Sequence, residues 1–250
     1  MSEAADTCVR MTDAILDKVR KLLAKAEDPG CTPAEAEALT DKAAQLIAKY
    51  GVDRALLAAA APETDPLGDR IVDIGPPYAL DKAGLLATVA GALRCRSVRR
   101  KQSTSQGYAF AMHLFGYASD LERFELLFTS LLVQASLALS AVEIPEWDSI
   151  AAFRRSWLVG FAFAVGERLR QAERRAQAAP DVGGGPSVAL VLADRSDRVD
   201  RRVDEAYPRL RVSAPRRLVG GGMDGGYAAG QRADLGVSRI SWPERRHLPH

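Results

Sequence analysis

Cationic side chains gather in three places in this sequence, and clusters of this kind are suited to neutralising phosphate groups. The first is a stripe at helical spacing, formed by Lys18, Lys21 and Lys25. The second is the acid-free segment RCRSVRRKQ, residues 94–102, which contains Arg96, Arg99, Arg100 and Lys101. The third is a loop that contains Arg216 and Arg217. We expect these residues to contact the phosphate backbone of RNA or DNA, without base specificity.

The second cluster leads into a polar turn and then into a strand that carries aromatic residues. The turn spans residues 103–107, and Tyr108 and Phe110 follow it. A cationic arm next to exposed aromatic rings is typical of surfaces that bind single-stranded nucleic acid. Because this strand is also hydrophobic, its complete burial would put both rings out of reach of any ligand.

Residues typical of catalytic and metal sites are scarce. His113 is the only histidine before residue 247, and a single histidine in a strand is more typical of packing than of acid–base chemistry. The chain has no H-E-x-x-H motif, no C-x-x-C pair and no G-x-S-x-G elbow. We therefore expect no metal, no cofactor and no enzymatic activity. The alternative is a hydrolase or nuclease with a composite acidic site, which requires His113 in an open cleft beside at least two carboxylates.

The glycine-rich segment VGGGMDGGYAAG, residues 219–230, is another candidate for ligand contact. It lacks the lysine of a phosphate-binding P-loop. Gly226 and Gly230 lie four residues apart, so a helix over residues 224–233 would have one bare face that admits another backbone. Whether that neighbour is protein or a phosphate chain stays open.

Composition and charge favour a cytoplasmic protein with a polyanionic partner. Of the 250 residues, 47% are hydrophobic, and the formal net charge is +2. Residues 1–93 contain 10 basic and 15 acidic residues, whereas residues 94–250 contain 24 and 17, so the basic character lies in the second part. The apolar stretch 126–142 is interrupted by serine, threonine and glutamine, and we expect no membrane span. The first residues lack an apolar signal region.

The clearest predicted elements are two antiparallel helices over residues 15–51. The second begins with the capping box Thr32-Pro33-Ala34-Glu35 and is predicted to end at Gly51. A hairpin of this size buries too little surface to stand alone, so we expect it to dock on the rest of the chain or on a partner. A protein–protein adaptor is therefore a further alternative, and it requires an exposed apolar patch around Leu22, Leu39 and Leu46.

Beyond a linker at residues 61–68, the pattern predicts an α+β region with basic character. A strand at 70–74 and a helix capped by Asp81 precede a β-hairpin over 95–116. Two long antiparallel helices follow, one opened by a capping box at Ser119 and one over about 147–178. A charged helix to about Tyr207, the short helix over 224–233 and a strand over 237–242 complete the chain. The expected fold is mostly helical α+β, with domains at 1–60 and 69–250.

The N-terminal hairpin resembles a known family. Residues 15–53, ILDKVRKLLAKAEDPGCTPAEAEALTDKAAQLIAKYGVD, are similar to the bacterial and phage domain of unknown function 2786, in which a lysine-bearing helix, an E-A-E-A helix and a terminal KYG recur. The segments FRRSWLVGFAFAVGERL, ALVLADRSDRVDRRVDEAYP and GGYAAGQRADLG are similar to the region that often follows this domain in actinobacterial members. The resemblance implies phage or mobile-element settings, and hence nucleic-acid or ribonucleoprotein contexts. It implies no catalytic residue.

Taken together, the residues and the resemblance favour a non-enzymatic protein that binds RNA or DNA through basic patches. A ribosome-associated factor is one form of this hypothesis. A protein partner at the N-terminal hairpin belongs to the adaptor alternative.

Overall fold

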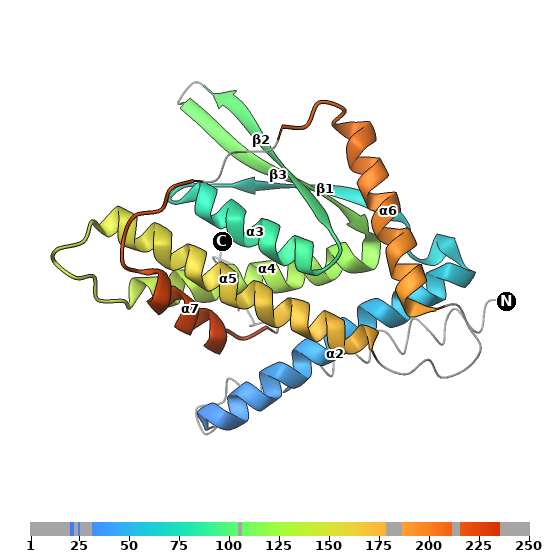
Figure 1. Cartoon of the computed structure of the whole chain (residues 1–250), viewed down its shortest axis with the longest axis horizontal. Coiled ribbons are helices and arrows are strands. Elements are labelled where there is room, and N and C mark those ends of the chain that lie inside the picture. The colour runs from blue at the N-terminus through green and yellow to red at the C-terminus, as the bar shows by residue number, and fades with distance from the viewer. Residues whose placement is uncertain are drawn as a thin grey trace, which may run out of the picture.

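The computed structural model describes residues 21, 22, 25, 32–104, 107–178, 187–211 and 216–235 (Figure 1). Within these residues, helices predominate and a small sheet lies along one side of the molecule. In chain order the elements are α2 (Pro33–Ala60), η1 (Pro62–Thr64), β1 (Leu67–Ile74), α3 (Ala79–Ala92), β2 (Arg96–Thr104), β3 (Gly107–Tyr117), α4 (Ala118–Ser140), α5 (Ile150–Gln177), α6 (Val188–Ala206) and α7 (Met223–Arg232). The mostly helical α+β fold predicted from the sequence is confirmed.

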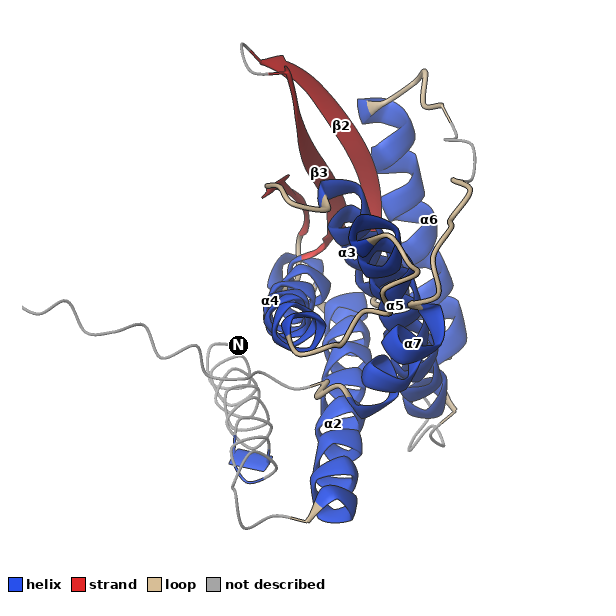
Figure 2. Ribbon diagram, turned by 90° about the vertical axis from the view of Figure 1, so that its left-hand side faces the viewer, coloured by secondary structure: helices blue, strands red, loops and turns tan. Residues whose placement is uncertain are grey.

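The sheet has the strand order β1-β3-β2, and β3 pairs antiparallel with both neighbours. The predicted hairpin over residues 95–116 is confirmed as β2 and β3. β1 ends with Ile74 opposite Phe110, whereas β2 continues to Thr104, opposite Gly107. The distal part of the β2–β3 hairpin therefore extends past the third strand, and Figure 2 shows it projecting from the helical body.

The two faces of the sheet pack against different helices, because successive strand residues point to opposite sides. On one face, Ile74, Met112 and Leu114 join the main core with α3 and α4. On the other face, Val98 and Phe115 pack against α6 in a separate cluster. Near its base the sheet is thus covered on both faces.

The long helices behind the sheet follow the predicted amphipathic pattern. α4 and α5 run in opposite directions in Figure 1, and α5 packs more extensively on α7 and α3 than on α4. The predicted inward residues are all buried: Leu121, Phe124, Phe128, Leu131, Ala135 and Leu139 on α4, and Phe153, Trp157, Phe161, Ala164 and Val165 on α5. All of them except Ala164 belong to the main core cluster.

α4 is also the one helix, in the part of the chain that the structure describes, whose length and composition would suffice to cross a membrane. In this structure 44% of its most apolar window is buried. Leu127 and Leu131 are almost fully enclosed. Packing in the core therefore accounts for much of its apolar character.

α2 begins as predicted and ends nine residues later than predicted. Thr32 Oγ1 accepts a hydrogen bond from the Glu35 amide at 3.3 Å, and Glu35 Oε2 accepts one from the Thr32 amide at 3.0 Å, so the capping box is confirmed. The predicted end at Gly51 is wrong, because the helix continues to Ala60. Gly51 is needed for space: a Cβ there would lie 2.0 Å from Arg123 Nη1.

The predicted linker at 61–68 is part of the ordered fold. Pro62–Thr64 form the short 3-10 helix η1, Asp65 is fully buried, and β1 begins at Leu67. Ala43 and Ile47 of α2 lie in the same core cluster as residues of α3, α4 and α5. The proposed division into two domains stays a prediction.

Two predicted caps are wrong because each side chain has a distant partner. Asp81 lies inside α3, whose N-cap is Tyr78 with a positive φ of 58°, and the buried Asp81 carboxylate accepts a hydrogen bond from Arg216. Ser119 does not cap α4, which begins at Ala118. Its amide and hydroxyl donate instead to Asp65, at 2.8 and 2.7 Å.

The glycine-rich segment packs on protein, which answers the question that the sequence left open. A Cβ on Gly226 would lie 1.9 Å from the Trp157 carbonyl oxygen, and one on Gly230 would lie 2.6 Å from the Phe161 carbonyl oxygen. The close neighbour of α7 is therefore the backbone of α5. The predicted strand at 237–242 and most of the predicted first helix lie outside the described residues.

Candidate functional site

Arg96, the first residue of β2, is held by an ion pair with α6. Its Nη2 lies 2.8 Å from Asp200 Oδ2, and its Nε also donates to this carboxylate. The hydrogen bond from Arg96 lowers the pKa of Asp200 against a smaller opposing effect of burial. The charge of Arg96 is thus largely balanced, and its main visible role is to fasten α6 to the sheet.

The other three cations of β2 lie farther along the hairpin and do not share one face. Arg99 and Lys101 are opposite Met112 and Phe110, on the face that continues from the main core. Arg100 is on the other face. Arg99 and Lys101 are exposed and Arg100 is partly buried. Strand alternation therefore places positive charge on both faces of the sheet, level with the last three residues of β1.

No acidic residue occurs anywhere between residues 96 and 117. The hairpin itself therefore contributes only positive formal charges, and β2 is an edge strand of the sheet. Phe110 is half-buried, so one of the two aromatic rings proposed for base contact is only partly accessible. The side chain of Tyr108 lies outside the described residues.

The remaining predicted contacts lie elsewhere on the molecule. Lys21 and Lys25 are exposed, and Lys18 lies outside the described residues. Arg217 is exposed, whereas Arg216 donates to the carboxylate of Asp81. The β2–β3 hairpin projects at one end of the molecule, and α2 begins at the opposite end (Figure 2). The predicted residues thus do not form one continuous surface, and the acid-free part of the hairpin is the strongest remaining candidate.

His113 forms a chain of hydrogen bonds across the sheet. Its Nε2 lies 2.8 Å from Asp69 Oδ2, and its Nδ1 lies 2.7 Å from Tyr207 Oη at the end of α6. Its ring also packs against Phe115, with centroids 4.2 Å apart. Asp69 is the only carboxylate that contacts it among the described residues, and the His113 side chain is 14% exposed. These features do not meet the requirement set for the hydrolase alternative.

Two further sequence hypotheses concern metal ligands and an exposed apolar patch on the N-terminal hairpin. Among the described residues, no group of three or more His, Cys, Asp or Glu side chains is arranged to hold a metal ion. Leu22, Leu39 and Leu46 are each half-buried, and Leu46 packs against the main core. Most of the first helix of this hairpin lies outside the described residues, so the adaptor alternative stays a prediction.

The largest feature that the sequence analysis missed is a group of ionised side chains inside the protein. We refer to it as the buried ion network: Asp65, Arg94, Asp120, Arg123, Glu173 and Arg195. Each of these side chains is at most 10% exposed. Three carboxylates face three guanidinium groups, so the network is formally neutral, which is the condition for keeping charges in a protein interior.

Asp120 lies at the centre of the network. Its carboxylate accepts hydrogen bonds from Arg123 Nη1 at 2.8 Å, Arg94 Nη2 at 3.0 Å and Arg195 Nη2 at 3.3 Å. Glu173 of α5 accepts from Arg94 and Arg123. Burial opposes the charge on Arg94, but Asp120 and Glu173 outweigh it and raise the pKa of Arg94. Arg94 therefore stays charged at physiological pH.

Asp65 connects the network to the start of α4. Its carboxylate accepts from the Ser119 amide and hydroxyl and from Arg195 Nη2, the last at 2.7 Å. It thereby places negative charge at the positive end of the α4 dipole. The only local sequence signal for the network was the three-residue spacing of Asp120 and Arg123, since the other partners are distant in the chain.

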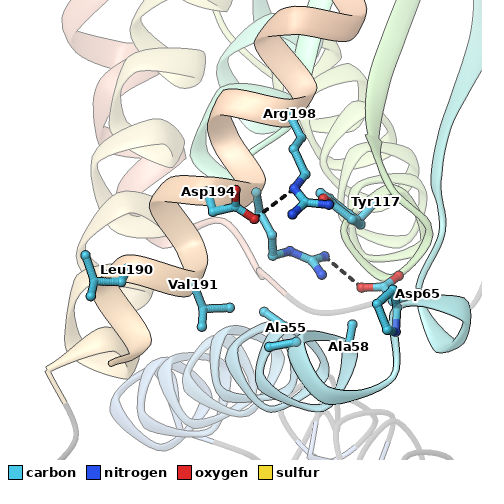
Figure 3. Close-up of a pocket in the computed structure, with 11 residues that line it drawn as sticks. Ala55, Ala58, Asp65, Tyr117, Leu190, Val191, Asp194 and Arg198 are labelled. Carbon is cyan, nitrogen blue, oxygen red and sulfur yellow. Dashed lines mark hydrogen bonds and ion pairs between the residues drawn. The ribbon is translucent and has the colours of Figure 1, made fainter. Parts of the chain in front are cut away.

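The network borders a pocket of about 310 Å³ between the end of α2 and α6 (Figure 3). Its apolar wall includes Ala55, Ala58 and Val191. The guanidinium of Arg195 lies 3.6 Å from the centroid of the Tyr117 ring, a cation–π arrangement. Burial raises the pKa of Tyr117, so its hydroxyl stays protonated.

The charges that line this pocket are balanced by partners within it. Arg195 pairs with Asp65, and Arg198 pairs with Asp194 at 2.8 Å. Figure 3 draws both ion pairs. The pocket is therefore electrically neutral and has no unpaired charge to offer a charged ligand.

Comparison with known proteins assigns only the N-terminal segment. Residues 14–54 match the family described as protein of unknown function, DUF2786. No curated protein and no solved structure matches the chain. The DUF2786 segment includes α2 as far as Arg54, and it ends before the sheet and before every residue of the buried ion network. The looser similarity of the downstream segments to the usual C-terminal region stays a prediction.

Proposed function

We propose that the protein binds nucleic acid through the projecting β2–β3 hairpin, which contacts phosphate groups without reading base sequence. The observation that carries this proposal is the absence of acidic residues in β2 and β3, together with the position of Arg99, Arg100 and Lys101 just before the hairpin extends past the end of β1. A ribonucleoprotein is one form of partner with this chemistry.

The geometry of the arm suits a phosphate backbone better than a compact anion. Cations alternate between its two faces, so the arm would lie in a groove or along a strand with phosphates on either side. Contacts of this kind release counterions, and the affinity falls steeply as salt is raised. The competing explanation is that the cations protect an exposed edge strand from pairing with another chain. The two explanations differ in whether polyanion affinity depends on these residues.

The test compares two triple charge reversals in the full chain. One carries Arg99→Glu, Arg100→Glu and Lys101→Glu, and the matched control carries Lys42→Glu, Arg155→Glu and Arg170→Glu, which are exposed on α2 and α5. Both change the net charge equally. Affinity for a mixed-sequence RNA and a DNA duplex is measured by fluorescence anisotropy across a range of salt concentrations.

The hairpin triple should weaken binding by about tenfold or more and lower the salt dependence of log K by about two to three units, because about one counterion is released per phosphate contact. The control should retain most of the affinity and the slope. Equal losses in the two triples would show that only net charge matters. The absence of any binding by the natural chain at about 50 mM salt would end the proposal.

A further inference from the structure

A second pocket, of about 220 Å³, lies where α3, α4 and α5 meet on the side of the molecule away from α6. Lys82 of α3 and Arg154 of α5 line it together with apolar side chains of α4 and α5. No acidic residue is part of its lining. This distinguishes it from the neutral pocket between α2 and α6.

The two cations of this pocket have no carboxylate partner among the residues that the structure describes. The nearest acidic residue in sequence to Lys82 is Asp81, and its carboxylate is occupied by Arg216. Arg154 Nε is buried and has no hydrogen-bond partner within the described part of the chain. Because an unmet buried donor is costly, an anion at this place would be favoured.

The position of Arg154 in its helix adds a second reason. Arg154 is near the N-terminal end of α5, which begins at Ile150 and has no acidic residue in its first turn. The helix dipole favours negative charge at that end and disfavours a cation.

The rest of the lining is apolar and limits the size of the ligand. Leu132 and Leu139 of α4, Leu158 of α5 and the Tyr78 ring surround the cations. An apolar cavity of about 150 Å³ is large enough for benzene, so this pocket has room for one ring and an anionic group. An inorganic ion would leave the leucine wall without contacts.

We propose that this pocket binds a small organic anion, with Arg154 and Lys82 holding a carboxylate or phosphate group and the three leucines enclosing an apolar body of about one ring. The planar guanidinium of arginine suits either group, because both offer two oxygens for paired hydrogen bonds. This site is separate from the β2–β3 hairpin, and its occupancy does not depend on nucleic-acid binding.

The experiment titrates the full chain with four probes and follows binding by calorimetry. Phenyl phosphate and benzoate carry the proposed chemistry, benzyl alcohol lacks the charge, and inorganic phosphate lacks the ring. Both organic anions, or one of them, should bind about tenfold or more tightly than benzyl alcohol and inorganic phosphate, because a hydrogen-bonded charge and the apolar contacts each contribute. The organic anion that binds more tightly shows whether the site prefers a phosphate or a carboxylate.

The variants locate the binding site. Lys82→Gln with Arg154→Gln should weaken organic-anion binding by about tenfold or more, whereas the control pair, Lys42→Gln with Arg155→Gln, should leave it unchanged. Ser136 lines the mouth and is exposed, so Ser136→Trp should block the pocket while keeping both charges. If the charge variant does not fold, the Ser136→Trp variant still tests whether the probes bind in this pocket.

Three results would overturn the proposal. The first is that neither organic anion binds the natural chain. The second is that inorganic phosphate binds as tightly as phenyl phosphate. The third is that binding persists in the Ser136→Trp variant. The hairpin triple described above should bind the probes normally, so failure of this proposal and failure of nucleic-acid binding are distinguishable.

Discussion

Cys95 is the residue whose environment departs most from what its type alone suggests. It follows Arg94 at the end of α3, is 2% exposed and lies against Gly116, where a Cβ would approach its Sγ to 2.7 Å. Burial, followed by the negative charge of Asp120, raises the pKa of the Cys95 thiol. The nearby arginines oppose this shift only in part. The thiol is therefore protonated and unreactive at neutral pH, since the thiolate is the reactive form.

This raised pKa predicts a loss of stability in alkaline solution. The folded state keeps the proton of Cys95, whereas the unfolded chain releases it with a pKa of about 8.5. The stabilising contribution is complete below about pH 8 and falls as pH rises above the unfolded value, by about 2 kcal/mol between pH 7 and pH 10. We expect the advantage of the natural chain over Cys95→Ala, measured by urea unfolding at several pH values, to shrink by about this amount. A constant difference would contradict the raised pKa.

The contact between α5 and α7 is set by glycines at the scale of whole elements. Gly160 on α5 faces the Met223 carbonyl oxygen, where a Cβ would lie 2.0 Å away, and Gly226 on α7 faces Trp157. The two backbones therefore approach more closely than side chains would allow. Arg168 strengthens the end of this contact by donating to the carbonyl oxygens of Gly230 and Ala233, at 3.1 and 2.6 Å.

Neighbouring glycines of α7 provide a matched test of this contact. Gly226→Ala should destabilise the protein by about 1–3 kcal/mol, because the added methyl group overlaps the α5 backbone. Gly225 is exposed, and a Cβ there would meet Trp157 at an ordinary 3.5 Å. Gly225→Ala should therefore be neutral or stabilising by up to about 1 kcal/mol through helix propensity. Thermal or urea unfolding of both variants measures the difference, and equal effects would exclude a close backbone contact.

The buried ion network acts at the scale of the whole molecule, because its members come from distant elements. Asp65 precedes β1, Arg94 follows α3, Asp120 is on α4, Glu173 is on α5 and Arg195 is on α6. α2 takes part through Gly51, which leaves room for the guanidinium groups of the network. Separating these elements would leave buried charges without partners, which is strongly destabilising.

Removing one cation from the network should therefore have a large effect. Arg123→Met leaves the carboxylates of Asp120 and Glu173 short of a partner and should cost about 3–5 kcal/mol of unfolding free energy. Arg70 forms an ion pair with Glu125 at 2.7 Å in which both side chains are about half exposed, so Arg70→Met should cost no more than about 1 kcal/mol. Urea unfolding of the two variants provides the comparison. Similar small losses would show that the network is not tightly coupled.

The sequence by itself determined the local features of this protein. The 3.6-residue pattern gave the buried faces of α4 and α5, the alternating pattern gave β2 and β3, and the Thr32–Glu35 spacing gave the start of α2. It also identified the acid-free basic segment and the DUF2786 hairpin. All of these depend on residues that are close in the chain, so their physical cause is visible in the order of residues.

Only the tertiary structure decided which polar groups have partners. The sequence predicts that α2 ends at Gly51. In the structure the helix continues, and Gly51 leaves space for the guanidinium groups of Arg123 and Arg94. Ser119 is predicted to cap α4, but its amide donates a hydrogen bond to Asp65. Arg96 is predicted to contact phosphate, but it forms an ion pair with Asp200. Partners such as Asp65 and Arg195 are 130 residues apart. Because burial changes the energy of a charge far more than its neighbours in sequence do, such pairings emerge only when the chain is folded.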